Sequence, residues 1–196
     1  MKKILLVLLI ITLTGCSPHE TSVTNPNGNS KTYKFFKQKN YNHNQYTLIL
    51  TNDSQKITII KKDKQIYYEL SSNKVKQIII EKEGKKYTLN NDNKTYTIED
   101  IVNYDDFAKG YLPESLNSLK NKKYKKATIF NFLSKYVYEK YTYSEGETIY
   151  YFKRNKLVKI ENKTPLTKNK VKVINLSTKV DKSKFNVPKE YQEIIY

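Results

Sequence analysis

Cysteine, tryptophan and arginine are almost or wholly missing from this chain of 196 residues. The single cysteine, Cys16, leaves no partner for an intramolecular disulfide, so the fold depends on its core alone. Tryptophan is absent and there are 18 tyrosines, which makes tyrosine the main large side chain. Arg154 is the only arginine among 36 basic residues. Because arginine suits bidentate phosphate recognition, this composition argues against a dedicated nucleic-acid-binding module.

Residues that carry catalytic or metal chemistry are also scarce. The two histidines, His19 and His43, do not have the spacing of a metal site or of a catalytic triad. No nucleophile elbow, zinc-protease helix motif or phosphate-binding glycine loop occurs. The adjacent acids Glu99-Asp100 and Asp105-Asp106 are typical of capping or solvated charge, with a glycosidase-like carboxylate pair as the minor alternative. The sequence therefore predicts a protein that is not an enzyme, with no catalytic residues, metal or cofactor.

No apolar run is long enough to span a membrane. The longest, Ile4 to Ile11, follows a positively charged start, Met1-Lys2-Lys3. A transmembrane helix needs about 20 apolar residues. A shorter run after a basic start is typical of the hydrophobic region of a secretory signal peptide, which we predict over residues 1–15.

The tetrad Leu13-Thr14-Gly15-Cys16 closes this region and resembles the lipobox of bacterial lipoproteins. The resemblance implies that Cys16 is the lipid attachment site, carrying diacylglyceryl and palmitate chains, and becomes the mature N-terminus. Two or three acyl chains anchor a protein stably where one does not. The expected location is the extracytoplasmic face of the cell membrane. The alternatives are a chance cysteine in an ordinary signal peptide and a short N-terminal membrane anchor.

Basic charge dominates the chain, with a formal net charge of +17. Removing residues 1–15, which contain Lys2 and Lys3 and no acid, leaves 17 − 2 = +15. One interpretation is a well-solvated surface. The other is attraction to anionic lipid headgroups or acidic envelope polymers, worth roughly 1 kcal/mol for each lysine near a charged membrane.

The mature chain is predicted to hold one domain. Residues 16–32 are polar and contain two prolines and a glycine, which predicts a flexible lipid-anchored linker before a single β-rich domain over residues 33–196. Tyr33 to Phe36 is expected to be a short strand or a packing segment. Six short runs rich in Ile, Val, Tyr and Thr then follow, separated by turn residues, and they predict an antiparallel meander. These runs are Tyr46–Leu50, Lys56–Lys61, Gln65–Leu70, Val75–Glu81, Lys86–Leu89 and Thr95–Ile98.

Apolar and polar residues alternate in several of these runs, so one sheet face should be covered and the other should face water. Val75–Ile80 is more uniformly apolar than the other runs and is expected to be covered on both sides. Pro113–Lys120 predicts a short helix that covers the sheet. Residues 127–141 suit either helix or strand, and we favour strands with a break near Asn131–Ser134. Three further strands are expected at Thr148–Lys153, Leu157–Glu161 and Lys170–Leu176.

The predicted fold class is mainly β with minor α: a curved antiparallel meander sheet, or half-open barrel, covered by one or two short helices. This layout over residues 46–191 resembles the LolA/LppX-like lipoproteins. The specific similarities are Tyr87-Thr88-Leu89 with Lys94-Thr95-Tyr96, the hairpin from Tyr150-Tyr151-Phe152 to Leu157-Val158-Lys159-Ile160, and the closing pattern from Val180-Asp181 through Val187-Pro188 to Tyr191. Glu190 stands where a glycine often precedes the tyrosine. The resemblance implies binding of a lipid or another apolar ligand between sheet and helices.

The sequence leaves two functions open. In the first, a membrane-anchored, non-enzymatic protein holds an apolar ligand in the concave sheet. In the second, an envelope interaction module binds anionic lipids or cell-wall polymers with its lysine-rich face. The tyrosine pairs, such as Tyr67-Tyr68, either line a groove or pack across strands. The candidate ligand-binding residues of the first function are Leu48, Leu50, Ile57, Ile59, Ile66, Tyr68, Ile78 and Ile80.

Overall fold

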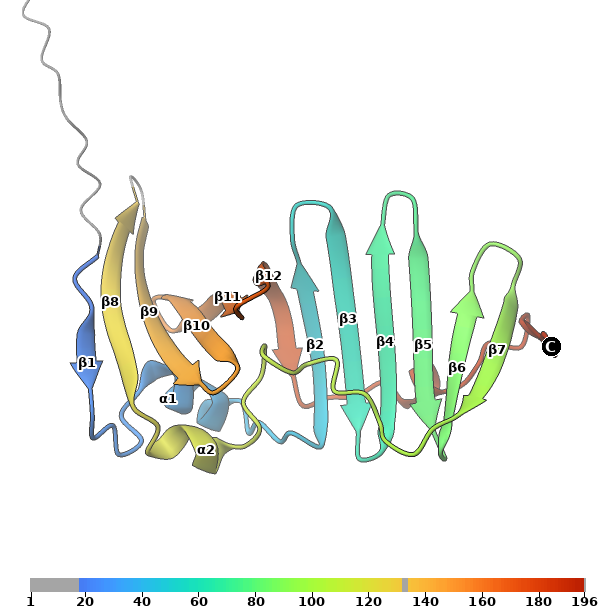
Figure 1. Ribbon diagram of the computed structural model, residues 1–196, viewed down its shortest axis with the longest axis horizontal. Helices are drawn as coiled ribbons and strands as arrows, with labels where there is room; N and C mark the ends of the chain where they lie inside the picture. The colour runs from blue at the N-terminus through green and yellow to red at the C-terminus, as the bar shows by residue number, and fades with distance from the viewer. Residues whose placement is uncertain (1–17, 132–133, 196) are drawn as a thin grey trace, which may run out of the picture.

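The computed structural model describes residues 18–131 and 134–195, so the predicted signal peptide and Cys16 lie outside the described residues. Within these ranges the protein is mainly β, with 52% strand and 10% helix, and its 13 strands form one sheet that is not closed (Figure 1). Two short helices, α1 (Lys31–Gln38) and α2 (Leu116–Lys120), contact each other. The predicted fold class is confirmed. None of the helices in the described part is long and apolar enough to cross a membrane.

The sheet joins two antiparallel meanders. The last strand of the second meander, β12, pairs with the first strand of the first, β2, so the order is β1-β8-β9-β10-β11-β12-β2-β3-β4-β5-β6-β7-β13. The two edge strands are β1 (Thr21–Val23) and β13 (Gln192–Glu193). The first meander consists of β2 (Gln45–Thr51), β3 (Gln55–Lys62), β4 (Gln65–Ser72), β5 (Lys76–Lys82), β6 (Lys85–Asn90) and β7 (Thr95–Asp100). The second consists of β8 (Tyr124–Asn131), β9 (Ser134–Tyr143), β10 (Gly146–Lys153), β11 (Lys156–Lys163) and β12 (Lys168–Ser177).

Most predicted strands coincide with observed ones. The six predicted runs of the first half correspond to β2 through β7, and the strand interpretation of residues 127–141 is confirmed by β8 and β9. Local turn chemistry explains part of this agreement. Glu83 and Gly84, between β5 and β6, have φ angles of 53° and 74°. A two-residue hairpin turn with both φ values positive matches the twist of its strands, and glycine accepts such a φ without steric cost.

Two local predictions need correction. Tyr33 to Phe36 is a packing segment, as one of the two alternatives has it, but it is not a strand. It is the middle of α1, because the Ser30 hydroxyl caps the helix by accepting a hydrogen bond from the Tyr33 backbone N–H at 3.0 Å. Phe36 then lies fully buried on the helix side that faces the sheet. The helix predicted over Pro113–Lys120 begins later, at Leu116, because Ser115 forms a capping box with Ser118.

The linker predicted over residues 16–32 is much shorter than expected. Thr21–Val23 forms β1 and pairs with β8, and Ser30 is completely buried. Glu20 is held by Lys140, with an ammonium–carboxylate distance of 2.6 Å, and by the Tyr138 hydroxyl at 2.8 Å. From Glu20 onward the chain is therefore part of the fold, and residues 20–32 do not form a spacer.

One face of the sheet, here called the helix face, packs against α1, α2 and the loop from β7 to α2. Its core includes Leu48 and Leu50 from β2 and Phe36 from α1. The stacked rings of Tyr68 and Phe107, with centroids 4.4 Å apart, tie the β7–α2 loop to β4. In Figure 1 this loop passes in front of β2 to β5.

The opposite face is partly covered as well. The segment after β12, with the 3-10 helix η1 (Lys182–Phe185), crosses behind the first meander in Figure 1. Phe185 and Tyr191 of this segment pack on Ile78 and Ile80 of β5. Since Ile79 is also buried, β5 is covered on both sides as predicted, whereas the expectation of a fully water-facing second face is wrong for this region.

Candidate functional site

The eight residues predicted to line an apolar ligand site do not share one face. Strand register places six of them on the helix face: Leu48, Leu50, Ile57, Ile59, Ile66 and Tyr68. Ile78 and Ile80 lie on the opposite face, because Ile79 is the residue paired with Tyr68. Adjacent residues of a strand point to opposite faces, so the three consecutive isoleucines, Ile78 to Ile80, gave no sign of their register.

The six helix-face residues lie within or beside a packed core. Leu48 and Leu50 are 0% exposed and Ile59 is 1% exposed. Their cluster also contains Phe36 and Leu119 from the two helices. Protein side chains therefore occupy the space in which the LolA-like resemblance places a ligand.

The tyrosines pack across strands, which agrees with the packing alternative. Tyr141 and Tyr150 face each other from β9 and β10 with ring centroids 5.9 Å apart. Tyr138 and Tyr151 do the same on the opposite face at 5.6 Å. Burial raises the pKa of all four hydroxyls above their ordinary value, so they are neutral over the physiological range.

Lysines gather on the face opposite the helices, here called the lysine face. Cross-strand pairing places lysines from both meanders there, whereas Lys61, Lys86, Lys126 and Lys135 belong to the helix face. The strand lysines of the lysine face include Lys56, Lys62, Lys76, Lys82, Lys85, Lys125, Lys140, Lys159, Lys163, Lys168, Lys170 and Lys172. Alternation along each strand thus sorts the basic charge preferentially to one side.

Carboxylates on this face neutralise some of these lysines. Glu161 is 4% exposed and lies 3.4 Å from the Lys163 ammonium and 3.6 Å from the Lys168 ammonium. Burial by itself would raise the pKa of Glu161, but the hydrogen bond from Tyr151 and the nearby ammonium charges together lower this pKa, so the carboxyl is ionised. Glu20 pairs with Lys140 and Lys125 in the same way.

Three neighbouring lysines lie beside these pairs, and we call them the lysine trio: Lys159, Lys170 and Lys172. Glu161 is the cross-strand partner of Lys170, but its ion pairs within 4 Å are with Lys163 and Lys168. Lys159 on β11 pairs directly with Lys172 on β12. The Lys159 ammonium lies 3.6 Å from the centroid of the Tyr151 ring, and the nearest acid to Lys172 is the fully exposed Asp53 at 3.8 Å. Burial, followed by the neighbouring Lys170, lowers the pKa of Lys159 to about 8. Like charges directly opposite on a sheet repel, so this cluster favours an anion.

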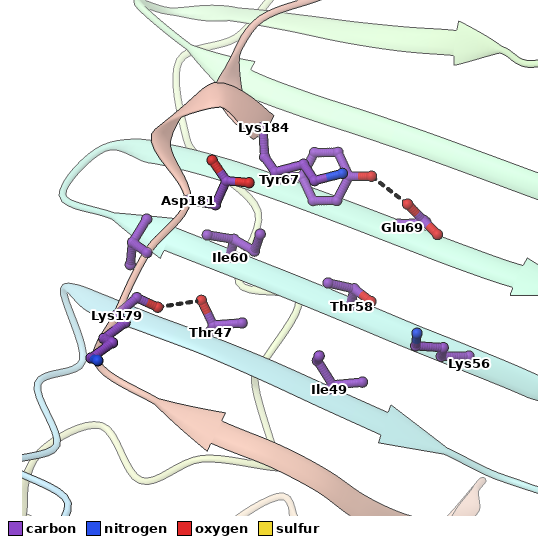
Figure 2. Close-up of a pocket in the computed structure, with 11 residues that line it drawn as sticks. Thr47, Ile49, Lys56, Thr58, Ile60, Tyr67, Glu69, Lys179, Asp181 and Lys184 are labelled. Carbon is purple, nitrogen blue, oxygen red and sulfur yellow. Dashed lines mark hydrogen bonds between the residues drawn. The ribbon is translucent and has the colours of Figure 1, made fainter.

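A groove crosses β2, β3 and β4, on the same face as the trio and beginning at the strand next to β12. Lys172 pairs with Thr51, which pairs with Lys56, a residue of the groove wall. Figure 2 shows Lys56, Thr58 and Ile49 at one end of the groove and Lys179 and Lys184 at the other. The volume is about 560 Å³, and the lining mixes apolar side chains with three lysines and two acids, Glu69 and Asp181.

A second groove of about 520 Å³ lies on the far side of Tyr67 and Lys184, which line both grooves. The Lys184 ammonium lies 5.5 Å from the centroid of the Tyr67 ring. Lys76, Lys94 and Lys189 also line the second groove. We call the lysine trio and the two grooves, which lie on the same face of the sheet, the lysine track.

His43, one of the two histidines considered for other chemistry, is held by neighbouring side chains. The His43 ring lies within hydrogen-bonding distance of the Tyr41 hydroxyl and of the Lys61 ammonium, both at 3.2 Å. Burial of the ring, followed by the positive charge of Lys61, lowers the pKa of His43. In the described ranges no group of three or more His, Cys, Asp or Glu side chains could hold a metal ion.

The lysine track was not predicted from the sequence. Its signal was present in part, because Lys168, Lys170 and Lys172 alternate along one strand and therefore share a face. Their proximity to Lys159 and to the grooves depends on the β11–β12 and β12–β2 pairings. Comparison with known proteins adds no family: no family model matches the chain, and no curated protein is significantly similar to it.

Proposed function

We propose that this chain is a lipid-anchored protein of the extracytoplasmic face of the cell membrane, and that its domain is a non-enzymatic module that binds an anionic envelope polymer along the lysine track. The lipobox-like tetrad ending at Cys16 supports the anchor. The lysine trio is the observation that carries the binding proposal. Three ammonium groups on adjacent strands gain most from a ligand that brings several negative charges.

The extent of the track supports a polymer as the ligand. The trio lies on β11 and β12, the first groove crosses β2 to β4, and the second reaches Leu89 of β6. Strands are about 4.8 Å apart, so the track covers roughly 30 Å of the sheet. An extended polyanion can engage such a surface at several points, and each additional contact is effectively intramolecular.

The mixed lining of the grooves suits a chain that carries both charge and apolar or sugar-like surface. Ile49 and Ile60 lie in the floor of the first groove between Lys56 and Lys184. Aromatic rings accept flat ligand surfaces, and Tyr67 stands between the two grooves. Anionic lipid headgroups would meet the same ammonium groups, and they are the competing ligand in the test.

The test measures binding of inorganic polyphosphate and of phosphatidylglycerol vesicles to a Cys16→Ser protein without the signal peptide. Replacing the trio by glutamine, K159Q/K170Q/K172Q, should weaken polyphosphate binding at least about tenfold, since each lost contact also removes counterion release. The matched control K34Q/K39Q/K120Q removes three exposed charges from the helix side and should change it by less than about threefold. Equal losses in both variants would contradict a specific track, and a preference for vesicles would replace the polymer by lipid.

The apolar-ligand function has less support, because the space between sheet and helices is filled. Native mass spectrometry with lipid extraction distinguishes the two proposals. A lipid that co-purifies with the protein, and is retained by the trio variant, would favour the helix face over the lysine track.

A further inference from the structure

The chain that precedes the sheet is too short to lift the domain away from its anchor. Glu20 is fixed by Lys140 and Tyr138, and only four residue steps separate it from Cys16. An extended chain covers at most about 3.6 Å per residue, so Cys16 lies within roughly 14 Å of Glu20. The lipid on Cys16 is part of the proposed function, and the orientation inferred below rests on it.

Strand pairing shows which part of the domain the anchor adjoins. Thr21 pairs with Lys126 and Val23 with Tyr124, so β1 runs antiparallel to β8. The chain before Thr21 therefore leaves alongside the later half of β8, toward the end where β8 finishes at Asn131 and β9 begins at Ser134. In Figure 1 the arrows of β1 and β8 point in opposite directions, so the beginning of β1 lies toward the end of β8.

The same end carries an exposed aromatic side chain. Phe130 is 77% exposed, whereas Phe36, Phe152 and Phe185 are at most 2% exposed. It lies four residues beyond Lys126, which at about 3.3 Å per residue is roughly 13 Å along the strand. The distance from Lys126 to Phe130 along β8 is therefore about the same as the longest distance that the extended chain can span between Glu20 and Cys16.

One lysine contacts this aromatic residue, and a second lies farther along the same face. The Lys135 ammonium, on the paired position of β9, lies 5.5 Å from the centroid of the Phe130 ring. Lys126 lies on the same strand face as Phe130 and is exposed. An exposed aromatic ring with one ammonium group beside it and another on the same face matches the layered chemistry of a membrane surface, in which rings sit at headgroup level and basic residues meet anionic lipids.

We propose that the β8–β9 end of the sheet rests on the membrane that anchors Cys16, with Phe130 in the interfacial layer and Lys126 and Lys135 at the lipid headgroups. The partner is an anionic bilayer surface. The lysine trio lies on β11 and β12, which only β10 separates from β9, but it belongs to the lysine face. Phe130 and its two lysines belong to the helix face, so the trio remains available to another ligand.

The absence of tryptophan gives a direct test, because Phe130→Trp introduces the only tryptophan of the chain. The lipidated protein is reconstituted into phosphatidylglycerol vesicles with or without brominated acyl chains, and vesicle attachment is first verified by flotation. Brominated lipid should quench about half of the F130W emission, and the emission should shift to the blue. The matched control, Val102→Trp, lies beyond β7 at the other edge of the sheet, where Val102 is 95% exposed, and should not be quenched.

F130W protein that floats with vesicles but is quenched no more than V102W would overturn this orientation and leave the lipid anchor standing. Protein that does not float would overturn the anchor itself and the orientation with it. Phe130→Ser provides a second reading: it should keep flotation, since acyl chains hold the protein. Its Lys135 should gain more accessibility to an amine-reactive reagent on vesicles than in detergent solution, where only the loss of the ring contact acts. Unchanged accessibility of Lys135 would count against the contact.

Discussion

Glu139 holds the first turn of α1 onto β9 through Thr32. Its carboxylate accepts hydrogen bonds from the Thr32 backbone N–H at 2.8 Å and the Thr32 hydroxyl at 2.7 Å, and from the Lys31 backbone N–H at 2.7 Å. Glu139 is 3% exposed. A carboxylate at a helix N-terminus satisfies N–H groups that the helix itself leaves free, so this contact fixes the helix that fills the helix face.

Glu139→Gln should lower the free energy of unfolding by about 1.5–3 kcal/mol. The glutamine side chain keeps one oxygen acceptor but carries no negative charge, so the remaining hydrogen bonds are weaker. Denaturant unfolding of the Cys16→Ser protein measures it. The control Glu114→Gln changes an exposed glutamate near α2 and should cost less than about 0.5 kcal/mol. Equal costs would show that Glu139 does not hold the helix.

Gly146→Ala should be among the most destabilising glycine substitutions. The φ of Gly146 is +152°, and a Cβ there would lie 2.0 Å from the backbone carbonyl oxygen of Lys163. Gly84 provides the comparison, since its φ is +74° but the nearest atom to an added Cβ is 3.8 Å away. We expect G84A to cost about 1 kcal/mol from backbone strain alone and G146A clearly more. Thermal unfolding of the two variants checks this order of stability. A lower melting temperature for G84A than for G146A would contradict it.

The β1 edge should loosen in acid. The hydrogen bond from Lys140 lowers the pKa of Glu20 below its usual value of 4.5, although partial burial opposes this. A carboxylate with a lowered folded-state pKa stabilises the fold above its unfolded pKa, and this contribution is lost as the pH falls through the folded-state pKa. Amide hydrogen exchange of Thr21–Val23, corrected for intrinsic rates, should therefore accelerate below pH 4.5. Glu20→Gln should show fast exchange already at neutral pH, and an unchanged rate in E20Q would refute the role of this ion pair.

Binding to the lysine track should weaken as the pH rises past 8. Lys159 loses its proton near pH 8, because burial and Lys170 lower its pKa from the usual 10.5. Polyphosphate affinity should fall by roughly threefold or more between pH 7 and 9, as one of the three trio charges disappears. Without ligand, the free energy of unfolding should rise as the pH rises from about 8 to 10.5. The reason is that the pKa of Lys159 is lower in the folded protein than in the unfolded chain, so the unfolded chain binds this proton more tightly over that range. Lys159→Gln should flatten both profiles; a wild-type affinity independent of pH would argue against the trio.

The sheet was largely predictable from sequence because its signals are local. β-branched and aromatic runs punctuated by Asn, Asp, Gly and Lys-rich turns set β2 through β7, and each hairpin is closed by its own turn. The strand interpretation of residues 127–141 succeeded for the same reason. Helix α1 was missed because its aromatic residues suggested a strand, although Ser30 before Tyr33 and Phe36 was a usable capping signal.

The site was less predictable because it depends on contacts between distant segments. Ile78 and Ile80 were assigned to the wrong side of the sheet relative to Leu48, since a continuous apolar run does not reveal its register. The role of Glu20 requires Lys140, far along the chain, and the lysine track requires β12 to return beside β2. Charge, in contrast, was informative in the sequence itself, because the basic excess suggested an anionic partner without any knowledge of the fold.

The most direct test of the lysine track is a backbone amide NMR titration of the Cys16→Ser protein with inorganic polyphosphate. The proposal predicts that chemical-shift changes concentrate on β11, β12, β2 and β3 and on residues 178–191, and that they diminish as salt rises past the range where exposed charges are screened. Shift changes confined to α1, α2 and the helix-face core, or a titration that leaves β11 and β12 unchanged, would contradict it.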